Sequence, residues 1–203
     1  GPVVQNNTHW TIDDNPVVIA GDLYFYDCNL TIDEGVEVLV REDYALVMVG
    51  GTLDVNGIEG SEGVFRPEDI DNAVQGIWKG IRGERGYIPG TNNWQEDTDL
   101  YFDYFLIDYA ETGIHYYPSD GGRAFEATNG IIRNSESFGL YCYRHYSGHM
   151  LIDSLEIHDN GSTAIHIERR YDEHVNISNS NLYNNGGNGI YVYQCYRDMR
   201  LSN

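Results

Sequence analysis

The chain has 203 residues, of which 41% are apolar and 13% aromatic, and its formal net charge is −20. This length and composition exclude a disordered chain and indicate one domain, or a small pair, with a substantial core. The charge, with Lys79 as the single lysine, argues against nucleic acid as a partner, because phosphate binding needs clustered cations. No apolar run approaches the ~20 residues of a membrane span, so we expect no membrane insertion.

The first third of the chain predicts short strands. We interpret Gly1 and Pro2 as the remnant of a cleaved tag, and residues 3–203 as a single domain excised from a longer chain. Residues 3–10 are polar and predict a cap or lead-in strand. Apolar and polar residues alternate over residues 17–55, as in strands with one buried face. Three apolar positions recur 23 residues later, so that Leu23, Leu30 and Ile32 match Leu46, Leu53 and Val55.

Two irregular stretches follow. Residues 57–72 predict a loop rich in carboxylates, which could ligate calcium, although solubility is the simpler explanation of the acidic charge. No calcium-binding motif is present, and we expect no cofactor; the acidic residues are Glu59, Glu62, Glu68, Asp69 and Asp71. Residues 84–99 predict a second long loop, in which we expect Trp94 to pack on the flank of the domain rather than bind a ligand.

A repeat organises the second half of the chain. Four short apolar segments begin at Gly113, Gly139, Ala164 and Gly189, at intervals of 26, 25 and 25 residues. Seven residues before each start lies an aliphatic residue: Leu106, Ile132, Ile157 and Leu182. Five residues before each start lies Asp or Asn: Asp108, Asn134, Asp159 and Asn184. A fixed period with strand-like alternation predicts a solenoid that adds one coil per repeat. With coils of about 23–26 residues, we expect a parallel β-helix, an all-β solenoid fold with an N-terminal cap.

The sequence also resembles a known family. Residues 10–36, the segment from Gly51 to Gly57 and the segment from Ile77 to Ile81 resemble the opening coils of right-handed parallel β-helix domains in large secreted or surface proteins of prokaryotes. The later coils are similar to the pectin-lyase-like repeat, as in the segment from Asn184 to Ile190. The resemblance implies an extracellular or cell-surface location, and a role such as adhesin, lyase, hydrolase or epimerase. It does not choose among these functions.

The repeat predicts which side chains point outward. If Ile114, Leu140, Ile165 and Ile190 point inward, with Tyr116, Cys142, Ile167 and Val192, then the residues between and after them form two outward rows. The first row is His115, Tyr141, His166 and Tyr191, and the second is Tyr117, Tyr143, Glu168 and Tyr193. We call these rows, with the polar residues that follow them, the Tyr/His/Arg face. Its candidate ligand-binding residues are Tyr117, Tyr141, Tyr143, Arg144, His145, His166, Glu168, Arg169, Tyr191, Tyr193 and Tyr196.

Three functions remain open for this face. Tyrosine rings can stack on sugar rings while Arg, His and Glu bind hydroxyl groups, so the first is a non-catalytic domain that binds a glycan or another surface partner. The second is a polysaccharide lyase or epimerase, for which Tyr143, His166, Glu168 and Arg169 could supply base, proton donor and cation. The third is a structural stalk segment, in which outward rows of like residues only stabilise the coils.

The remaining motifs predict structural roles. We expect no disulfide, because Cys142 and Cys195 lie about two strand spacings, near 10 Å, apart. Side-chain amides at one turn of each coil predict a ladder that satisfies backbone groups; they are Asn134, Asn160, Asn184 and Asn185. The histidines outside the face are scattered without the spacing of zinc ligands.

Overall fold

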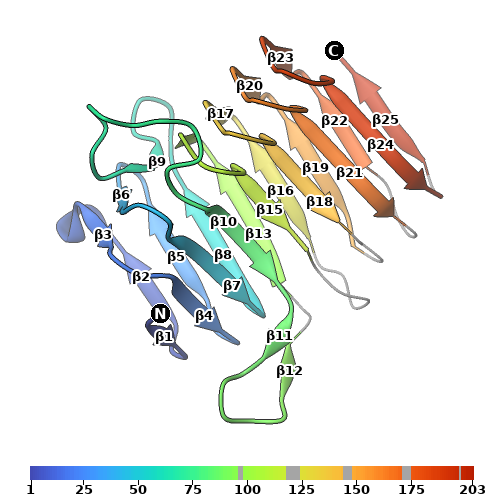
Figure 1. The fold of residues 1–203 in the computed structure, drawn as a ribbon. Helices are drawn as coiled ribbons and strands as arrows, with labels where there is room; N and C mark the ends of the chain where they lie inside the picture. Colours follow the sequence, from blue (N-terminus) through green and yellow to red (C-terminus); the bar gives the residue numbers. More distant parts are fainter. Residues whose placement is uncertain (96–97, 118–123, 144–147, 171–174, 197) are drawn as a thin grey trace.

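The computed structural model describes residues 1–203 except 96–97, 118–123, 144–147, 171–174 and 197, and it does not describe the side chains of residues 169 and 170. Within these described ranges the chain winds through three parallel β-sheets, and the only helix is the short 3-10 turn η1 (Ile12–Asp14). Each coil adds one strand to each sheet, and the two termini lie at opposite ends of the stack (Figure 1). The chain is therefore a parallel β-solenoid, as the repeat predicted.

Two of the sheets contain eight strands each. Sheet A comprises β1 (Val3–Val4), β4 (Leu23–Tyr26), β7 (Ala45–Val49), β10 (Gly80–Glu84), β15 (Ile114–Tyr116), β18 (Leu140–Tyr143), β21 (Ile165–Arg170) and β24 (Ile190–Cys195). Sheet B comprises β2 (Thr8–Trp10), β5 (Leu30–Asp33), β8 (Gly51–Asn56), β13 (Thr98–Asp103), β16 (Phe125–Thr128), β19 (Met150–Asp153), β22 (Val175–Ser178) and β25 (Met199–Ser202). Residues 3–10 thus supply lead-in strands of the first coil.

Sheet C has seven strands: β3 (Val17–Ile19), β6 (Glu37–Val40), β9 (Gly63–Pro67), β14 (Phe105–Asp108), β17 (Ile131–Arg133), β20 (Glu156–His158) and β23 (Asn181–Tyr183). Strand β9 lies inside the segment 57–72, for which a loop was predicted, and that prediction was wrong over this range. The segment has one inward apolar residue, Phe65, between Gly63 and Pro67, so it lacks a readable alternation. Pairing with β6 and β14 on either side makes it a strand.

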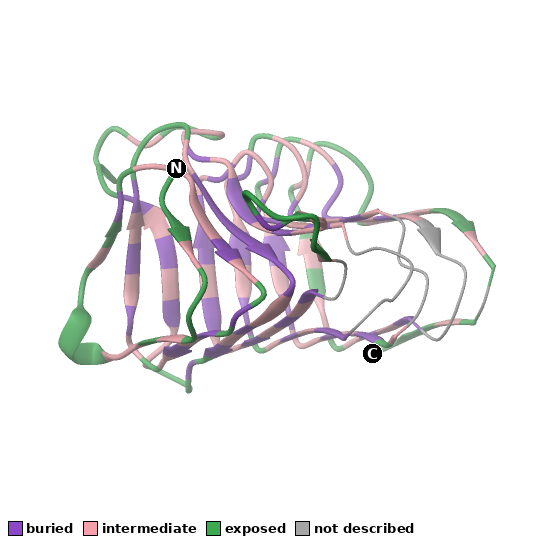
Figure 2. Ribbon diagram, turned by 90° about the horizontal axis from the view of Figure 1, so that it is seen from below, coloured by how far each residue is buried: buried purple, intermediate pink, exposed green. Residues whose placement is uncertain are grey.

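The core lies between the three sheets and follows the predicted register. Ile114 pairs with Leu140, Leu140 with Ile165, and Ile165 with Ile190. Ile114, Leu140 and Ile165 are fully buried. The predicted matches in the first coils, Leu23 with Leu46 and Leu30 with Leu53, are also strand partners. Buried and partly buried residues alternate along the strands (Figure 2). Every second side chain therefore enters one continuous apolar core.

One part of the predicted register is wrong by a single residue. Ile107, rather than Leu106, pairs with Ile132 and is buried, while Asp108 pairs with Arg133. The equivalent of Asn134 is therefore Tyr109, and both adopt left-handed backbone angles, with φ of 59° and 55°. Gly113 and Gly139 are 26 residues apart, whereas the paired Ile107 and Ile132 are 25 apart. The extra residue therefore lies between the turn at Asn134 and the apolar segment that begins at Gly139. Counting back from the glycine could not reveal where the insertion lies.

The predicted side-chain ladder forms at two of its four positions. The side chain of Asn160 accepts a hydrogen bond from the Ser135 backbone N–H at 2.9 Å and donates one to Asn185 Oδ1 at 2.9 Å. Asn185 in turn donates to the carbonyl oxygen of Ile157 at 2.9 Å. Asn134 instead donates to Asp108 Oδ1 at 2.8 Å. The amides thus satisfy turn groups that the sheets leave unpaired.

The cysteines are thiols: Cys28 and Cys142 are buried in the core and Cys195 is half-buried. Burial raises the pKa of the Cys28 thiol, which behaves as a small apolar side chain. In the described ranges, no helix is long and apolar enough to cross a membrane.

Candidate functional site

The Tyr/His/Arg face lies on the outer surface of sheet A, because inward and outward residues alternate along each strand. The register brings His115 beside Tyr141, Tyr141 beside His166 and His166 beside Tyr191. In the second row Tyr143 lies beside Glu168, and Glu168 lies beside Tyr193. Both predicted rows are therefore present.

The rings of the first row contact each other along its whole length. Ring centroids are 5.1 Å apart for His115 and Tyr141, 5.0 Å for Tyr141 and His166, and 4.7 Å for His166 and Tyr191. Phe138, which the sequence analysis missed, packs against Tyr141 at 5.2 Å and His166 at 4.9 Å. The row is thus a packed aromatic ridge, and a ligand can cover it but cannot enter between its rings.

Burial keeps the polar groups of this ridge uncharged. Desolvation, helped by the positive charge of Arg82, lowers the pKa of His115 to about 4, and desolvation also lowers the pKa of His166. Desolvation and the nearby Glu168 raise the pKa of Tyr141 to about 12. Neutral imidazoles and a protonated phenol remain at pH 7, and these groups can donate and accept hydrogen bonds without carrying charge.

Glu168 is the carboxylate at the centre of the face. Its Oε2 atom accepts a hydrogen bond from the Tyr141 hydroxyl at 3.3 Å and lies 3.7 Å from His166 Nε2. Tyr143, His166, Glu168 and Arg169 are the predicted catalytic candidates, and the structure adds Tyr141, whose hydroxyl donates to Glu168. The side chain of Arg169 lies outside the described residues, as do Arg144 and His145. A cation for a substrate carboxylate is therefore not part of this described cluster.

Among the described residues of the face, those at its C-terminal end are the most open to solvent. Tyr191 is 39% exposed, Tyr193 45% and Tyr196 59%. Tyr191 and Tyr193 stand on β24, whose pairing with β21 fixes their backbone. Rigid strands that present large exposed rings make a platform on which a flat, partly apolar ligand can stack.

The face continues toward the N-terminus through residues that the repeat did not reveal. Arg82 on β10 lies beside His115, and Arg82 Nε is 2.6 Å from Glu84 Oε1. A cavity of about 250 Å³ over β4, β7 and β10 is lined by Asp22, Tyr24, Asp43, Ala45, Val47, Lys79, Arg82 and Glu84. The long insertion between β10 and β15 hides this register. Matching Ile81 with Ile114 would have revealed it, because the two are strand partners.

The residues proposed for other roles are dispersed. In the segment 57–72, Glu68 pairs with Arg41 at 2.6 Å, and Asp69 accepts a hydrogen bond from Asn72. Over the described ranges, no three His, Cys, Asp or Glu side chains gather in an arrangement that could hold a metal ion. On sheet C, the rings of His158 and Tyr183 stack at 4.7 Å, a second aromatic contact that the sequence analysis did not anticipate.

The three parallel sheets and their coil-by-coil register define a parallel β-solenoid. Residues 98–203, over half of the chain, match the family described as "Right handed beta helix region", and the chain belongs to this family. No curated protein and no solved structure matches it. The family establishes the fold, while function has to be argued from the site.

Proposed function

We propose that this chain is a non-catalytic β-helix domain that binds a glycan through the Tyr/His/Arg face, outside the cell or at its surface. The exposed rings of Tyr191 and Tyr193 on β24, with the exposed Tyr196 just after this strand, carry the proposal. Such rings offer apolar faces for the C–H groups of a sugar, and their hydroxyl groups can bond its hydroxyls. The resemblance to domains of secreted and surface proteins supports the location.

The electrostatics of the face favour binding over catalysis. A general base works best when its pKa lies near the working pH, whereas burial lowers the pKa of both His115 and His166. Tyr141, with a pKa of about 12, is also held in its protonated form. The uncharged His115 ring and the Tyr141 hydroxyl suit a hydrogen-bonding surface for uncharged sugar hydroxyls, whereas His166 Nε2 is buried and has no hydrogen-bond partner among the described residues.

The test is a glycan array probed with the wild-type domain and with the double variant Tyr191→Ala/Tyr193→Ala. Loss of each ring should weaken binding about tenfold, equivalent to about 1.4 kcal/mol. Tyr183→Ala is the matched control, because Tyr183 is also 40% exposed but lies on sheet C. If the double variant binds as the wild type does, the face assignment is wrong.

A polysaccharide lyase or epimerase is the second candidate. It is favoured by Tyr141 and His166, which have shifted pKa values and lie beside the Glu168 carboxylate, because perturbed titratable groups often gather at catalytic sites. Incubation with alginate, pectate and chondroitin, with calcium supplied, should give unsaturated products if the domain is a lyase. Epimerisation would be measured by the exchange of the C5 proton of the sugar with solvent. The binding proposal expects neither change.

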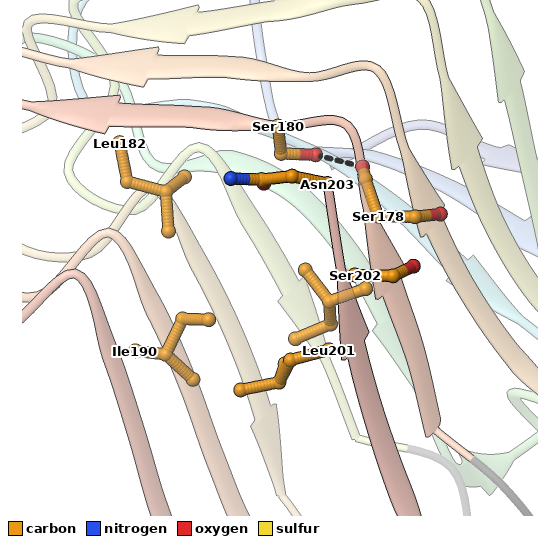
Figure 3. Close-up of a pocket in the computed structure, with 8 residues that line it drawn as sticks. Ser178, Ser180, Leu182, Ile190, Leu201, Ser202 and Asn203 are labelled. Carbon is orange, nitrogen blue, oxygen red and sulfur yellow. Dashed lines mark hydrogen bonds between the residues drawn. The ribbon is translucent and has the colours of Figure 1, made fainter.

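The C-terminal end of the solenoid supports a structural role within a larger parent chain. Leu182, Ile190 and Leu201 line an open cavity of about 260 Å³ there, beside Ser180 and Asn203 (Figure 3). Leu201, at a core position of β25, is 59% exposed. A further coil stacked on β23, β24 and β25 would bury these side chains and pair the open strand edges. A fusion that adds such a coil should raise the thermal unfolding midpoint.

A further inference from the structure

The hairpin of β11 (Gly86–Tyr87) and β12 (Trp94–Gln95) is a second aromatic surface next to the face. It follows strand β10 closely and projects beyond the sheets (Figure 1). Tyr87 and Trp94 are antiparallel partners whose ring centroids lie 4.6 Å apart at 71°. They are 59% and 41% exposed, so Trp94, which the sequence predicted to pack on the flank of the solenoid, keeps a large part of its ring open to solvent. Tyrosine and tryptophan are enriched at binding surfaces, because each ring offers an apolar face together with a polar group.

Arg85 joins this pair to the Tyr/His/Arg face. Its guanidinium carbon lies 5.9 Å from the centroid of the Trp94 ring and 4.7 Å from that of Tyr117. The same guanidinium donates a hydrogen bond to the Tyr117 hydroxyl at 2.8 Å. Tyr117 contacts Tyr143 with ring centroids 5.1 Å apart. Trp94, Arg85, Tyr117 and Tyr143 thus form an unbroken row that runs into the second row of the face.

The length of this surface limits what can cover it. Four strand spacings separate β10, which leads into the hairpin, from β24, which carries Tyr193. At ~4.8 Å per spacing, the two ends of the surface lie roughly 19 Å apart along the solenoid. A single sugar ring cannot contact both ends, whereas a chain of several sugars can.

We infer that Trp94 is a second sugar-stacking residue, held in place by Arg85, and that the site takes a linear oligosaccharide that reaches from the hairpin to β24. This inference rests on the proposed glycan-binding function. Beyond that function, it specifies that the ligand is several sugars long and that it also contacts Trp94, which lies outside the repeat. Arg85 acts here as a positioning residue, because it fixes Trp94 against the face through the Tyr117 hydroxyl.

The test compares wild type with Trp94→Ala and Trp94→Phe on an array of neutral glucan, xylan, mannan and galactan oligosaccharides, from disaccharides to octasaccharides. Wild type should bind long members more tightly than short ones. Trp94→Ala should bind long members about tenfold more weakly, with short members unaffected, and Trp94→Phe should retain most of the affinity. Tyr183→Ala, on sheet C, should match the wild type at every length.

Tryptophan fluorescence gives an independent readout. Trp78 is fully buried, with its Nε1–H bonded to the Asp108 carbonyl oxygen, and Trp10 packs against Phe25, so Trp94 is the exposed tryptophan of the three. Octasaccharides that bind should shift the emission of the wild type but not that of Trp94→Phe.

The outcomes separate this inference from the function on which it rests. If Tyr191→Ala/Tyr193→Ala loses binding while Trp94→Ala binds long chains like the wild type, the hairpin inference is wrong and the glycan function stands. If the wild type shows no preference for longer chains, the inference is also wrong. If the wild type binds no sugar on the array, both proposals fail.

Discussion

The substitution Ile165→Ala tests the central physical claim about the fold, that the coils share one closed core. Ile165 is fully buried on β21, between Leu140 on β18 and Ile190 on β24. Losing three buried carbons costs about 2.4 kcal/mol at about 0.8 kcal/mol each, and the closed cavity left behind adds about 1 kcal/mol or more. We therefore expect the free energy of unfolding to fall by about 3–4 kcal/mol.

Ile190→Ala is the matched control, since it makes the same chemical change one coil further on. Ile190 is only partly buried and lines the open cavity at the C-terminal end, so its truncation enlarges a space that solvent already reaches. We expect a loss of about 1 kcal/mol. Urea unfolding followed by circular dichroism measures both values, with the m-value as a check on the transition. Equal losses for the two variants would refute the closed-core reasoning.

Three further predictions concern the turns and the ionisation of the face. Asn160→Ala leaves the Ser135 N–H without its side-chain acceptor and should lower the free energy of unfolding by about 1–3 kcal/mol in urea. Gly51→Ala would bring a Cβ within 2.2 Å of the Cys28 carbonyl oxygen and should prevent folding at 37 °C. Gly90 has the same φ of 77° but lies in open space, so Gly90→Ala should lower the free energy of unfolding by only about 1–2 kcal/mol. A soluble, folded Gly51→Ala protein would contradict the coil packing. Since the pKa of His115 is about 4 in the folded chain and 6.5 ordinarily, the unfolded chain takes up this proton first, and stability is lost as pH falls from 6.5 to 4. His115→Phe should flatten that part of the pH profile of unfolding, and NMR titration of His115 with a midpoint near 6.5 would contradict the buried environment.

The amino-acid sequence by itself determined the solenoid, the inward positions and the two outward rows. Inward residues such as Leu140 and Ile165 recur at a fixed interval because each coil must bury the same positions against the next. A period is visible along the chain without any knowledge of contacts. The same counting located Tyr141, His166 and Tyr191 on one face, since a strand has a side-chain repeat of two residues.

Only the tertiary structure decided where insertions fall and which exposed residues touch. An extra residue in a turn leaves the coils stacked but shifts the count, so Tyr109 rather than Asp108 matches Asn134. The strand Gly63–Pro67 exists because neighbouring coils pair with it on both sides, and its own residues give no such pattern. The contact of Arg85 with both Trp94 and Tyr117 depends on how a hairpin outside the repeat lies against the face. Periodicity constrains residues that stack from coil to coil, whereas side chains on insertions are positioned only by the three-dimensional contacts that they form.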